Sequence, residues 1–335
     1  MNRKLILCGA GANGKEYLYL LGREKIDYFV DRNVDLQKSG VENVPVKSYE
    51  ELFCTPDCGD IIITVNEPVK SEIAKILDEH HLTYWRSIEE YFLSQNGARA
   101  MEKYHNIHEG ESCFLVGSGP SLTVDDLEKL QAKHITVFAP NKIFKLFDQT
   151  RWRPDYYVVT DRRIMNFYQE DISNLQLEHR FFAYYRDKSL QNFYRTICKN
   201  DAHLFCMKDV SGTDDYYDFS TDPGEYIVEG RTVIYAMAQL AYYMGFKKMY
   251  LLGVDFSYAD QTGYDKNGKD HFCKDYIEEG ETVLITPREY ALRAFESADH
   301  FAKQHGIEIF NATRGGCLEV FERVDMDEFL QGETK

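Results

Sequence analysis

Two glycine-rich stretches of the sequence have the residue types that a phosphate-binding turn requires. Residues 9–14 read GAGANG and follow the apolar run KLILC, and residues 113–122 read CFLVGSGPSL. Glycine lets a backbone come close to a phosphate, and backbone N–H groups at the start of the next helix attract anions. Both stretches are therefore candidate sites for a nucleotide or another anionic ligand.

The first stretch matches the dinucleotide fingerprint G-x-G-x-x-G through Gly9, Gly11 and Gly14. The next apolar run ends on Asp31, where an acid that binds a ribose would lie. A second interpretation is structural, because a tight turn between a strand and a helix needs glycine whatever it binds, and the fingerprint alone is weak. The sequence leaves both interpretations open, so these four residues are a candidate N-terminal cofactor site.

The second stretch, Gly117-Ser118-Gly119-Pro120-Ser121, lacks the third glycine of that fingerprint and the Gly-Lys-Ser/Thr ending of a P-loop. Pro120 fits the first turn of a helix, because no N–H donor is needed there. The N–H groups of residues 118, 119 and 121, with the hydroxyls of Ser118 or Ser121, would then point at an anion. A tight turn with a serine cap is the structural alternative. We favour the ligand, because polar residues recur where other strands of this half end.

Those polar residues follow the predicted strands of the C-terminal half. In an open parallel sheet, ligands bind beyond the carboxyl ends of the strands. One polar residue at such a place is commonly a cap, but a set of them along one edge indicates a binding site. The residues concerned are Asn141, Thr160, Asp161, Asp255 and Asn311.

Further candidates lie in a polar loop and at a helix start. His271, in KDHFCKDY, has the pKa range needed to take a proton from an acceptor hydroxyl. Arg231 and Thr232 open the apolar stretch 230–245, where the start of a helix favours phosphate. Most loop histidines and most arginines are simply solvated, so each of these assignments is a hypothesis. Additional cations are Arg162, Arg163 and Arg288.

The elements that must position these residues form two alternations of strand and helix. In the first 95 residues, Ser48 and Glu51 fit a capping box at a helix start. This alternation predicts a small parallel α/β domain over residues 1–95. Its predicted strands are 4–9, 26–31 and 60–65.

The second alternation covers residues 113–330 and predicts a larger domain, after a polar linker at 96–112. The fold class is therefore α/β, with two tandem Rossmann-like domains and mainly parallel sheets. The segments 211–229 and 257–285 are predicted to be long loops that bind or cover a ligand. Predicted strands are 113–117, 134–141, 155–161, 179–186, 202–207, 249–256 and 307–313, and the clearest helices are 230–245 and 287–306.

Composition limits the classes of partner. The net charge of −16 disfavours nucleic acid and anionic membranes. The sequence has no apolar run near the roughly 18 residues of a spanning helix and no signal peptide, so we expect no transmembrane segment and a cytoplasmic location. It has no Asp-x-Asp metal motif between a predicted strand and the loop that follows it, so we expect neither a metal nor a required cofactor. The 24 tyrosines leave room for a homo-oligomer interface.

The C-terminal half resembles a known group of enzymes. VGSGPSL, FAPNKIF, EGRTVIYAMAQLAYYMGFKKMYLLGVDF, DHF and IEIFNATRGGCLEVFERVD are together similar to the catalytic domain of bacterial lipooligosaccharide sialyltransferases. They are more similar still to relatives that include the flagellin motility accessory factors. The same superfamily contains 6-hydroxymethylpterin diphosphokinase-like proteins. The resemblance covers about residues 110–330, and residues 1–95 resemble the small Rossmann-like modules that precede sugar-modifying transferases.

The resemblance implies an inverting, metal-independent glycosyltransferase. It would move a sialic-acid-like (nonulosonic) sugar from a CMP-activated donor to a surface glycan or a protein acceptor. His271 would be the catalytic base, and Asp161 stands where the family has a second Asn. The nucleotide would contact Gly117, Ser118, Gly119, Ser121, Asn141 and Thr232. Candidates for phosphate-binding tyrosines are Tyr258, Tyr264 and Tyr276.

Two other functions remain open at this point. A diphosphokinase that transfers pyrophosphate from ATP to a pterin would need Mg²⁺ and hence clustered carboxylates. Asp161 and Asp255, which we expect at the ends of neighbouring strands, would supply them, and the Asn-to-Asp departure favours this alternative. The other is a nucleotide-binding module without catalysis, in which His271→Ala would leave ligand binding intact.

Overall fold

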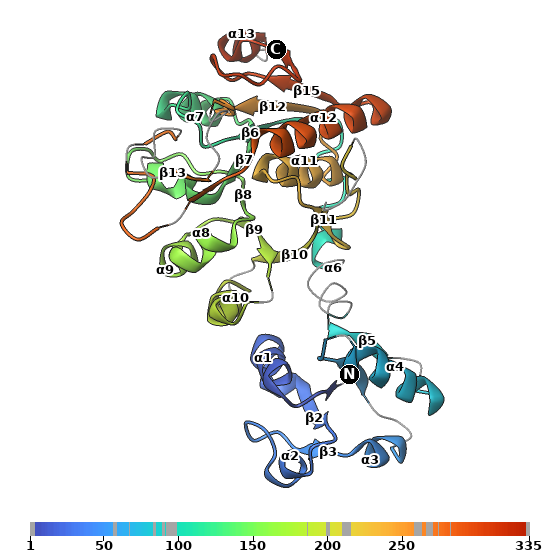
Figure 1. Ribbon diagram of the computed structural model, residues 1–335. Helices are drawn as coiled ribbons and strands as arrows, with labels where there is room; N and C mark the ends of the chain where they lie inside the picture. The colour runs from blue at the N-terminus through green and yellow to red at the C-terminus, as the bar shows by residue number, and fades with distance from the viewer. Residues whose placement is uncertain are drawn as a thin grey trace. The chain divides into compact units, whose positions relative to one another are not determined.

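The computed structural model forms two compact units, each with its own parallel sheet (Figure 1). The first comprises Met1–Gln95 and Arg186–Thr196, and the second comprises Asn96–Tyr185 and Ile197–Lys335. The predicted fold class is confirmed. The structure describes residues 4–55, 59–66, 68–82, 85–88, 91, 99–185, 187–198, 202–209, 216–257, 263–265, 271–273, 275–281 and 283–332.

The sheet of the first unit has the order β3-β2-β1-β4-β5, and every pair in it is parallel. The predicted capping box of Ser48 and Glu51 is confirmed at the start of α3. The strands are β1 (Leu5–Cys8), β2 (Ile26–Val30), β3 (Val46–Lys47), β4 (Asp60–Ile63) and β5 (Trp85–Ser87). The helical elements within residues 1–95 of this unit are α1 (Ala12–Leu21), η1 (Arg23–Lys25), α2 (Val34–Ser39), α3 (Tyr49–Phe53) and α4 (Val69–Glu79).

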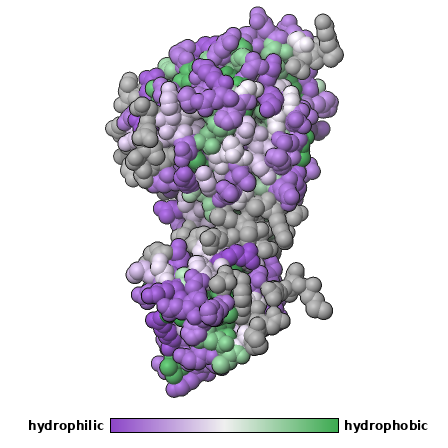
Figure 2. Space-filling view, turned by 90° about the vertical axis from the view of Figure 1, so that its right-hand side faces the viewer, coloured by the Kyte–Doolittle hydropathy of each residue, from purple (hydrophilic) through white to green (hydrophobic). Residues whose placement is uncertain are grey.

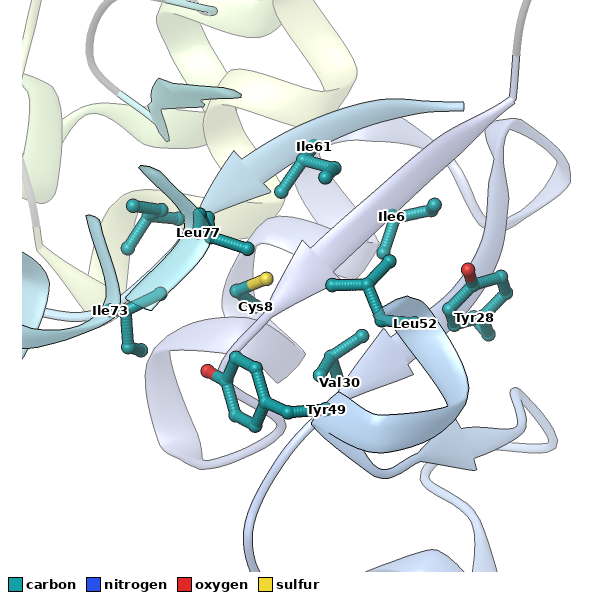
Figure 3. Close-up of a cluster of buried hydrophobic side chains, with 10 residues drawn as sticks. Ile6, Cys8, Tyr28, Val30, Tyr49, Leu52, Ile61, Ile73 and Leu77 are labelled. Atoms are coloured by element: carbon teal, nitrogen blue, oxygen red, sulfur yellow. The ribbon is translucent and has the colours of Figure 1, made fainter. Parts of the chain in front are cut away.

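One core cluster of this unit lies on the face of the sheet that α3 and α4 cover (Figure 3). Alternate residues of a strand share a face, and Ile6 and Cys8 of β1 accordingly point to the same cluster. Leu52 of α3 and Leu77 of α4 pack onto it. All four residues of β1 are buried, as is usual for the central strand of a parallel sheet.

The sheet of the second unit has the order β11-β10-β9-β8-β7-β6-β12-β15-β16, and the strands of every pair are parallel. Its strands are β6 (Ser112–Val116), β7 (Thr136–Pro140), β8 (Tyr156–Val159), β9 (His179–Tyr184), β10 (His203–Lys208), β11 (Ile227–Val228), β12 (Lys248–Leu252), β15 (Glu308–Asn311) and β16 (Glu322–Arg323). A separate antiparallel pair, β13 (Gly263–Asp265) and β14 (Val283–Ile285), lies within the predicted loop 257–285.

This strand order places a topological switch at β6. The strands β7 to β11 follow one another to one side of it, whereas β12 pairs with its other side. In such sheets the switch point is where ligands bind. The remaining helical elements are α6 (Arg99–Glu102), α7 (Val124–Ala132), η3 (Asn141–Leu146), α8 (Arg162–Phe167), α9 (Gln169–Asn174), η4 (Lys188–Leu190), α10 (Gln191–Cys198), α11 (Val233–Tyr243), α12 (Arg288–His305) and α13 (Met326–Gly332).

Both faces of the second sheet carry helices. Figure 1 shows α11 and α12 side by side, and α11 packs on β6, β7 and β8. An aromatic ladder of Phe114, Tyr250 and Phe310 stacks across β6, β12 and β15. Phe329 of α13 lies against the first two of these rings. Burial on both faces explains why the central strands are continuous apolar runs in the sequence.

Residues 99–111, which fall in the predicted linker, pack on the second unit. The N–H groups of Asn106, His108 and Gly110 donate to carbonyl groups of residues 243–245 at 2.8–3.1 Å. The Tyr104 hydroxyl lies 3.1 Å from His179 Nδ1 and 2.9 Å from His203 Nε2. These contacts hold the segment on the amino-terminal edge of the sheet.

The visible surface is mainly hydrophilic, with hydrophobic residues in small areas (Figure 2). In the part of the chain that the structure describes, no helix is long and apolar enough to cross a membrane. The large apolar side chains that the structure exposes are Tyr19, Val34, Val69, Ile107, Phe167, Tyr216 and Tyr290.

Candidate functional site

The turn after β6 packs directly against the turn after β12. The N–H groups of Gly117 and Gly119 donate to the carbonyl groups of Leu252 at 2.7 Å and Gly253 at 2.8 Å. A Cβ on Gly119 would lie 2.0 Å from an Asp255 carboxylate oxygen, and one on Gly117 would lie 2.4 Å from the Gly253 oxygen. The bare backbone of GSGPS is therefore required first by the neighbouring turn of the protein itself.

Asp255 and Ser121, both predicted to contact a nucleotide, bind each other. Asp255 Oδ2 accepts hydrogen bonds from the Ser121 hydroxyl at 2.8 Å and from the Ser121 N–H at 3.3 Å. The Asp255 carbonyl accepts from the Cys317 N–H at 2.7 Å. Asp255 is only 8% exposed. This carboxylate therefore fixes the turn of β6 to that of β12.

Asn141 follows β7, which is the other neighbour of β6. Its backbone is left-handed, with φ of 46°, and its carbonyl accepts a hydrogen bond from the Tyr157 hydroxyl at 2.5 Å. Its side-chain oxygen Oδ1 is buried and has no hydrogen-bond partner among the described residues. An unmet buried acceptor costs about 1–3 kcal/mol, and strained backbone gathers at functional sites. A ligand N–H or O–H group would satisfy this oxygen.

His271 lies against the GSGPS turn that follows β6. The N–H of the next residue, Phe272, donates to the Ser118 carbonyl at 3.1 Å. The imidazole stacks on the Tyr276 ring, with 3.7 Å between the ring centres and 16° between the planes. Burial raises the pKa of the Tyr276 phenol, and a hydrogen bond with the Ser118 side chain opposes this rise. The structure thus brings His271, Tyr276 and Ser118 together.

A buried ion pair that was not predicted from the sequence holds the segment 275–281, which includes Tyr276. Lys142 Nζ lies 2.7 Å from Glu281 Oε1, and Tyr168 donates its hydroxyl to Glu281 Oε2 at 2.7 Å. Lysine and glutamate are common surface residues, and these two are 139 positions apart in the sequence. The only signal was that Lys142 is a charged residue in the mainly apolar FAPNKIF.

Arg231 and Thr232, the predicted phosphate contacts at the start of α11, both bind other groups of the protein. Arg231, with φ of 57°, forms ion pairs with Glu229 at 3.3 Å and Asp209 at 3.6 Å. Thr232 caps α11, since its hydroxyl oxygen accepts from the Ile234 N–H at 3.4 Å. These contacts leave the start of α11, rather than the Arg231 charge, as the feature able to attract a phosphate.

The remaining predicted residues have separate environments. The Thr160 carbonyl accepts from the Tyr185 hydroxyl at 2.6 Å. The Arg288 guanidinium lies over the Phe256 ring, 4.9 Å from its centre. Asn311 is buried and bonded through its amide to Leu318 O and the Thr313 N–H. Tyr258 lies outside the described residues, and Tyr264 lies in β13.

The expectation that Asp161 and Asp255 end neighbouring strands is wrong. Asp161 follows β8 and Asp255 follows β12, and both β7 and β6 lie between these strands. Three steps between strands separate them by about 14 Å, whereas ligands of one Mg²⁺ lie about 2.1 Å from it. Asp161 instead caps α8 and pairs with Arg163 at 3.2 Å. Across the described residues, no group of three His, Cys, Asp or Glu side chains is suited to hold a metal.

In the first unit, the GAGANG turn is also closed by a carboxylate. Asp31 Oδ2 accepts a hydrogen bond from the Ala10 N–H at 2.8 Å. A Cβ on Gly14 would lie 1.9 Å from the Gly9 oxygen, and one on Gly9 would lie 2.5 Å from the Val65 side chain. Only open space surrounds a Cβ on Gly11. Asp31 and two of the glycines therefore have structural roles, as the second interpretation of this motif proposed.

Comparison with known families identifies the group to which the chain belongs. Residues 90–261 match the model of a family described as 6-hydroxymethylpterin diphosphokinase MptE-like. This match covers more than half of the 335 residues, so the chain belongs to the MptE-like family. The predicted resemblance to this superfamily is confirmed. His271 lies beyond the matched residues.

Two solved structures show weaker similarity. One is the MAf glycosyltransferase from Magnetospirillum magneticum AMB-1, with 15% identity, a TM-score of 0.38, and coverage of 99% of this chain and 60% of that one. The other is a D-isomer specific 2-hydroxyacid dehydrogenase family protein from Aeromonas salmonicida subsp. salmonicida A449, with 10% identity, a TM-score of 0.18, and coverage of 68% and 88%. The chain thus spans 60% of the MAf glycosyltransferase, and similarity at these scores carries no functional argument. No curated protein matches the chain.

Proposed function

We propose that the chain is a glycosyltransferase. It would move a sialic-acid-like (nonulosonic) sugar from a CMP-activated donor to a surface glycan or a protein acceptor, with inversion and without a metal. The observation that most supports this is the position of His271 on the GSGPS turn, one strand away from the open amide oxygen of Asn141. A candidate base and a buried amide oxygen able to accept from a nucleotide thereby lie together at the switch point of the sheet.

In the proposed reaction, the His271 imidazole takes the proton of the acceptor hydroxyl. The acceptor oxygen attacks the anomeric carbon, and the bond from that carbon to the phosphate oxygen of CMP breaks. CMP leaves with the electron pair, and the imidazolium returns its proton to solvent. Backbone N–H groups at the start of α11, which Thr232 caps, favour the charge that develops on the phosphate.

Thermal unfolding with CMP, CDP, UDP, GDP, ATP plus Mg²⁺, and NAD tests the ligand class. A ligand at one hundred times its Kd adds about 2.7 kcal/mol to the free energy of unfolding. Stabilisation by CMP or CDP without metal is expected, and stabilisation by NAD alone would contradict the proposal. With a CMP-activated donor, His271→Ala should lower kcat by about 10²-fold and leave CMP affinity intact. Binding without any turnover would instead indicate a non-catalytic nucleotide-binding module.

A second candidate is a diphosphokinase that uses ATP and Mg²⁺ to modify a pterin. The description of the matching family supports it. It would have to hold Mg²⁺ without a shared site of Asp161 and Asp255, because two strands separate their positions. Stabilisation only by ATP with Mg²⁺, followed by release of AMP when a hydroxymethylpterin is added, would favour this candidate over the glycosyltransferase.

A further inference from the structure

We infer that the buried ion pair of Lys142 and Glu281 holds His271 in place over the GSGPS turn, so that both are positioning residues. For its catalytic consequence the inference rests on the proposed function. The placement of the imidazole itself does not depend on which reaction the protein catalyses.

The pair forms the centre of a closed polar network. Lys142 has no exposed side-chain area, and that of Glu281 is 3%. The ammonium donates to Glu281 Oε1 at 2.7 Å and to the Tyr276 carbonyl at 2.6 Å. Glu281 Oε2 accepts from the Tyr168 hydroxyl at 2.7 Å and from the Glu278 N–H at 3.2 Å. Both charges therefore have partners despite their burial.

Such a pair is a costly way to obtain stability alone. Desolvation of two charges offsets much of their attraction, and apolar residues of similar size are often as stabilising. Burial lowers the pKa of Lys142, and the hydrogen bond and charge of Glu281 oppose this shift. What the pair adds is a fixed position for the segment 275–281, because each of its contacts holds one atom of that segment.

The contacts lead from the ion pair to the imidazole. The Lys142 ammonium lies 3.9 Å from the centre of the Tyr276 ring, and the His271 ring centre lies 3.7 Å from it. Two groups so close cannot share one face of the ring, so Tyr276 lies between them. Lys142 also follows Asn141 directly in the sequence. One ion pair thus links the residue with the open amide oxygen to the candidate base.

Lys145 provides a matched control. It binds the same segment, with its ammonium 3.0 Å from the Asp275 carbonyl and 2.5 Å from Glu278 Oε1. The Glu278 side chain is, however, 49% exposed, and exposed pairs of this kind contribute little. Loss of Lys145 should therefore leave His271 in place.

The test is histidine-selective NMR on the full chain, with the His271 signals assigned through His271→Gln. Stacking on Tyr276 should shift these signals upfield in the natural protein. Lys142→Met and Glu281→Gln should each remove the shift, whereas Lys145→Met should retain it. Thermal unfolding establishes which variants fold. The double variant Lys142→Met/Glu281→Gln leaves no buried unpaired charge, so it can be examined if a single variant fails to fold.

Kinetics with a CMP-activated donor add a second readout. The variants of Lys142 and Glu281 should lower kcat by at least about 10-fold while the Kd for CMP stays within about 3-fold. The double variant should be no worse than the poorer single one, because coupled residues are not additive. Unchanged His271 signals in a folded Lys142 or Glu281 variant would overturn the inference. Lost stacking in a protein that transfers no sugar would instead uphold the placement and reject the proposed function.

Discussion

The two glycine turns occupy equivalent places in the two units. Each follows the strand at which the order of its sheet changes direction, β1 in the first unit and β6 in the second. In each, glycines allow close backbone contact, and a carboxylate from another strand end accepts hydrogen bonds from the turn. Asp31 serves in the first unit and Asp255 in the second.

The turns differ in what lies beside them. Asp31 accepts a hydrogen bond from the N–H of Ala10, the second residue of GAGANG. Asp255 instead accepts a hydrogen bond from Ser121, which follows the proline of the turn. The Ser118 carbonyl accepts from the N–H of Phe272, the residue after His271. The second turn also has the open amide oxygen of Asn141 as a neighbour. Glycine spacing therefore reports close packing in both units, and only the surrounding side chains distinguish a candidate site.

The largest effect should come from adding a methyl group to each turn. Gly119→Ala should lower the free energy of unfolding of the second unit by about 3 kcal/mol, because the new Cβ would clash with Asp255 and Gly253. Gly11→Ala should cost the first unit less than about 1 kcal/mol, because space is open there. Each unit has one tryptophan, so urea unfolding of Trp85→Phe and Trp152→Phe backgrounds reports the units separately. Equal effects would contradict the packing difference.

Removal of the two carboxylates should have the next largest effect. Asp255→Ala should cost about 2 kcal/mol, because the buried Asp255 carboxylate is the acceptor for both the hydroxyl and the N–H of Ser121. Asp31→Ala should cost about 1 kcal/mol, because Asp31 is less buried than Asp255 and its contact with the Asn33 N–H is exposed. The same fluorescence measurement applies. A larger loss for Asp31 would show that the first turn depends more on its carboxylate than the second.

Asn141 should show opposite effects on stability and binding. Asn141→Gly removes both an unmet buried oxygen and a left-handed side-chain residue, so the second unit should gain about 1 kcal/mol. If the oxygen serves a nucleotide, the Kd for CMP should rise about 10-fold or more. Calorimetric titration and urea unfolding measure the two quantities. A variant that is less stable and binds equally well would contradict the assignment.

The smallest effect should be a pH dependence confined to the second unit. Burial lowers the pKa of His179 below its usual 6.5, the nearby charges being Glu178, Lys103, Asp155 and His108. As pH falls below about 6.5, the unfolded chain binds a proton that the folded unit does not, so stability decreases. Fluorescence of Trp152 during unfolding at several pH values should show this slope, and His179→Gln should reduce it. The Trp85 signal should be the same with and without the substitution.

The sequence was sufficient for the strands whose two faces are buried. Residues 113–116 of β6 form a continuous apolar run, and their prediction was accurate. The two-residue strands β11 and β16 have too few residues for any periodicity. Sequence order also gave no strand order, which is why Asp161 and Asp255 were wrongly taken as neighbours.

For the candidate site, local patterns predicted the turn, and the chemistry of His271 together with the resemblance made it the candidate base. The contact between them could not be derived, because the loop that carries His271 has no hydrophobic period. The Lys142–Glu281 pair was equally inaccessible, since its two residues are separated by 139 positions and neither is unusual by itself.

The place of β6 in the sheet has a consequence for biosynthesis. Its partner β7 follows it directly, but the β12 turn that packs on GSGPS is made late, and the Ser121–Asp255 contact spans 134 residues. A chain emerging from the ribosome therefore has β6 as an open edge until β12 appears. Contacts this distant slow folding, and open apolar edges invite aggregation. Nascent chains that stop before β12 should consequently be substrates for chaperones.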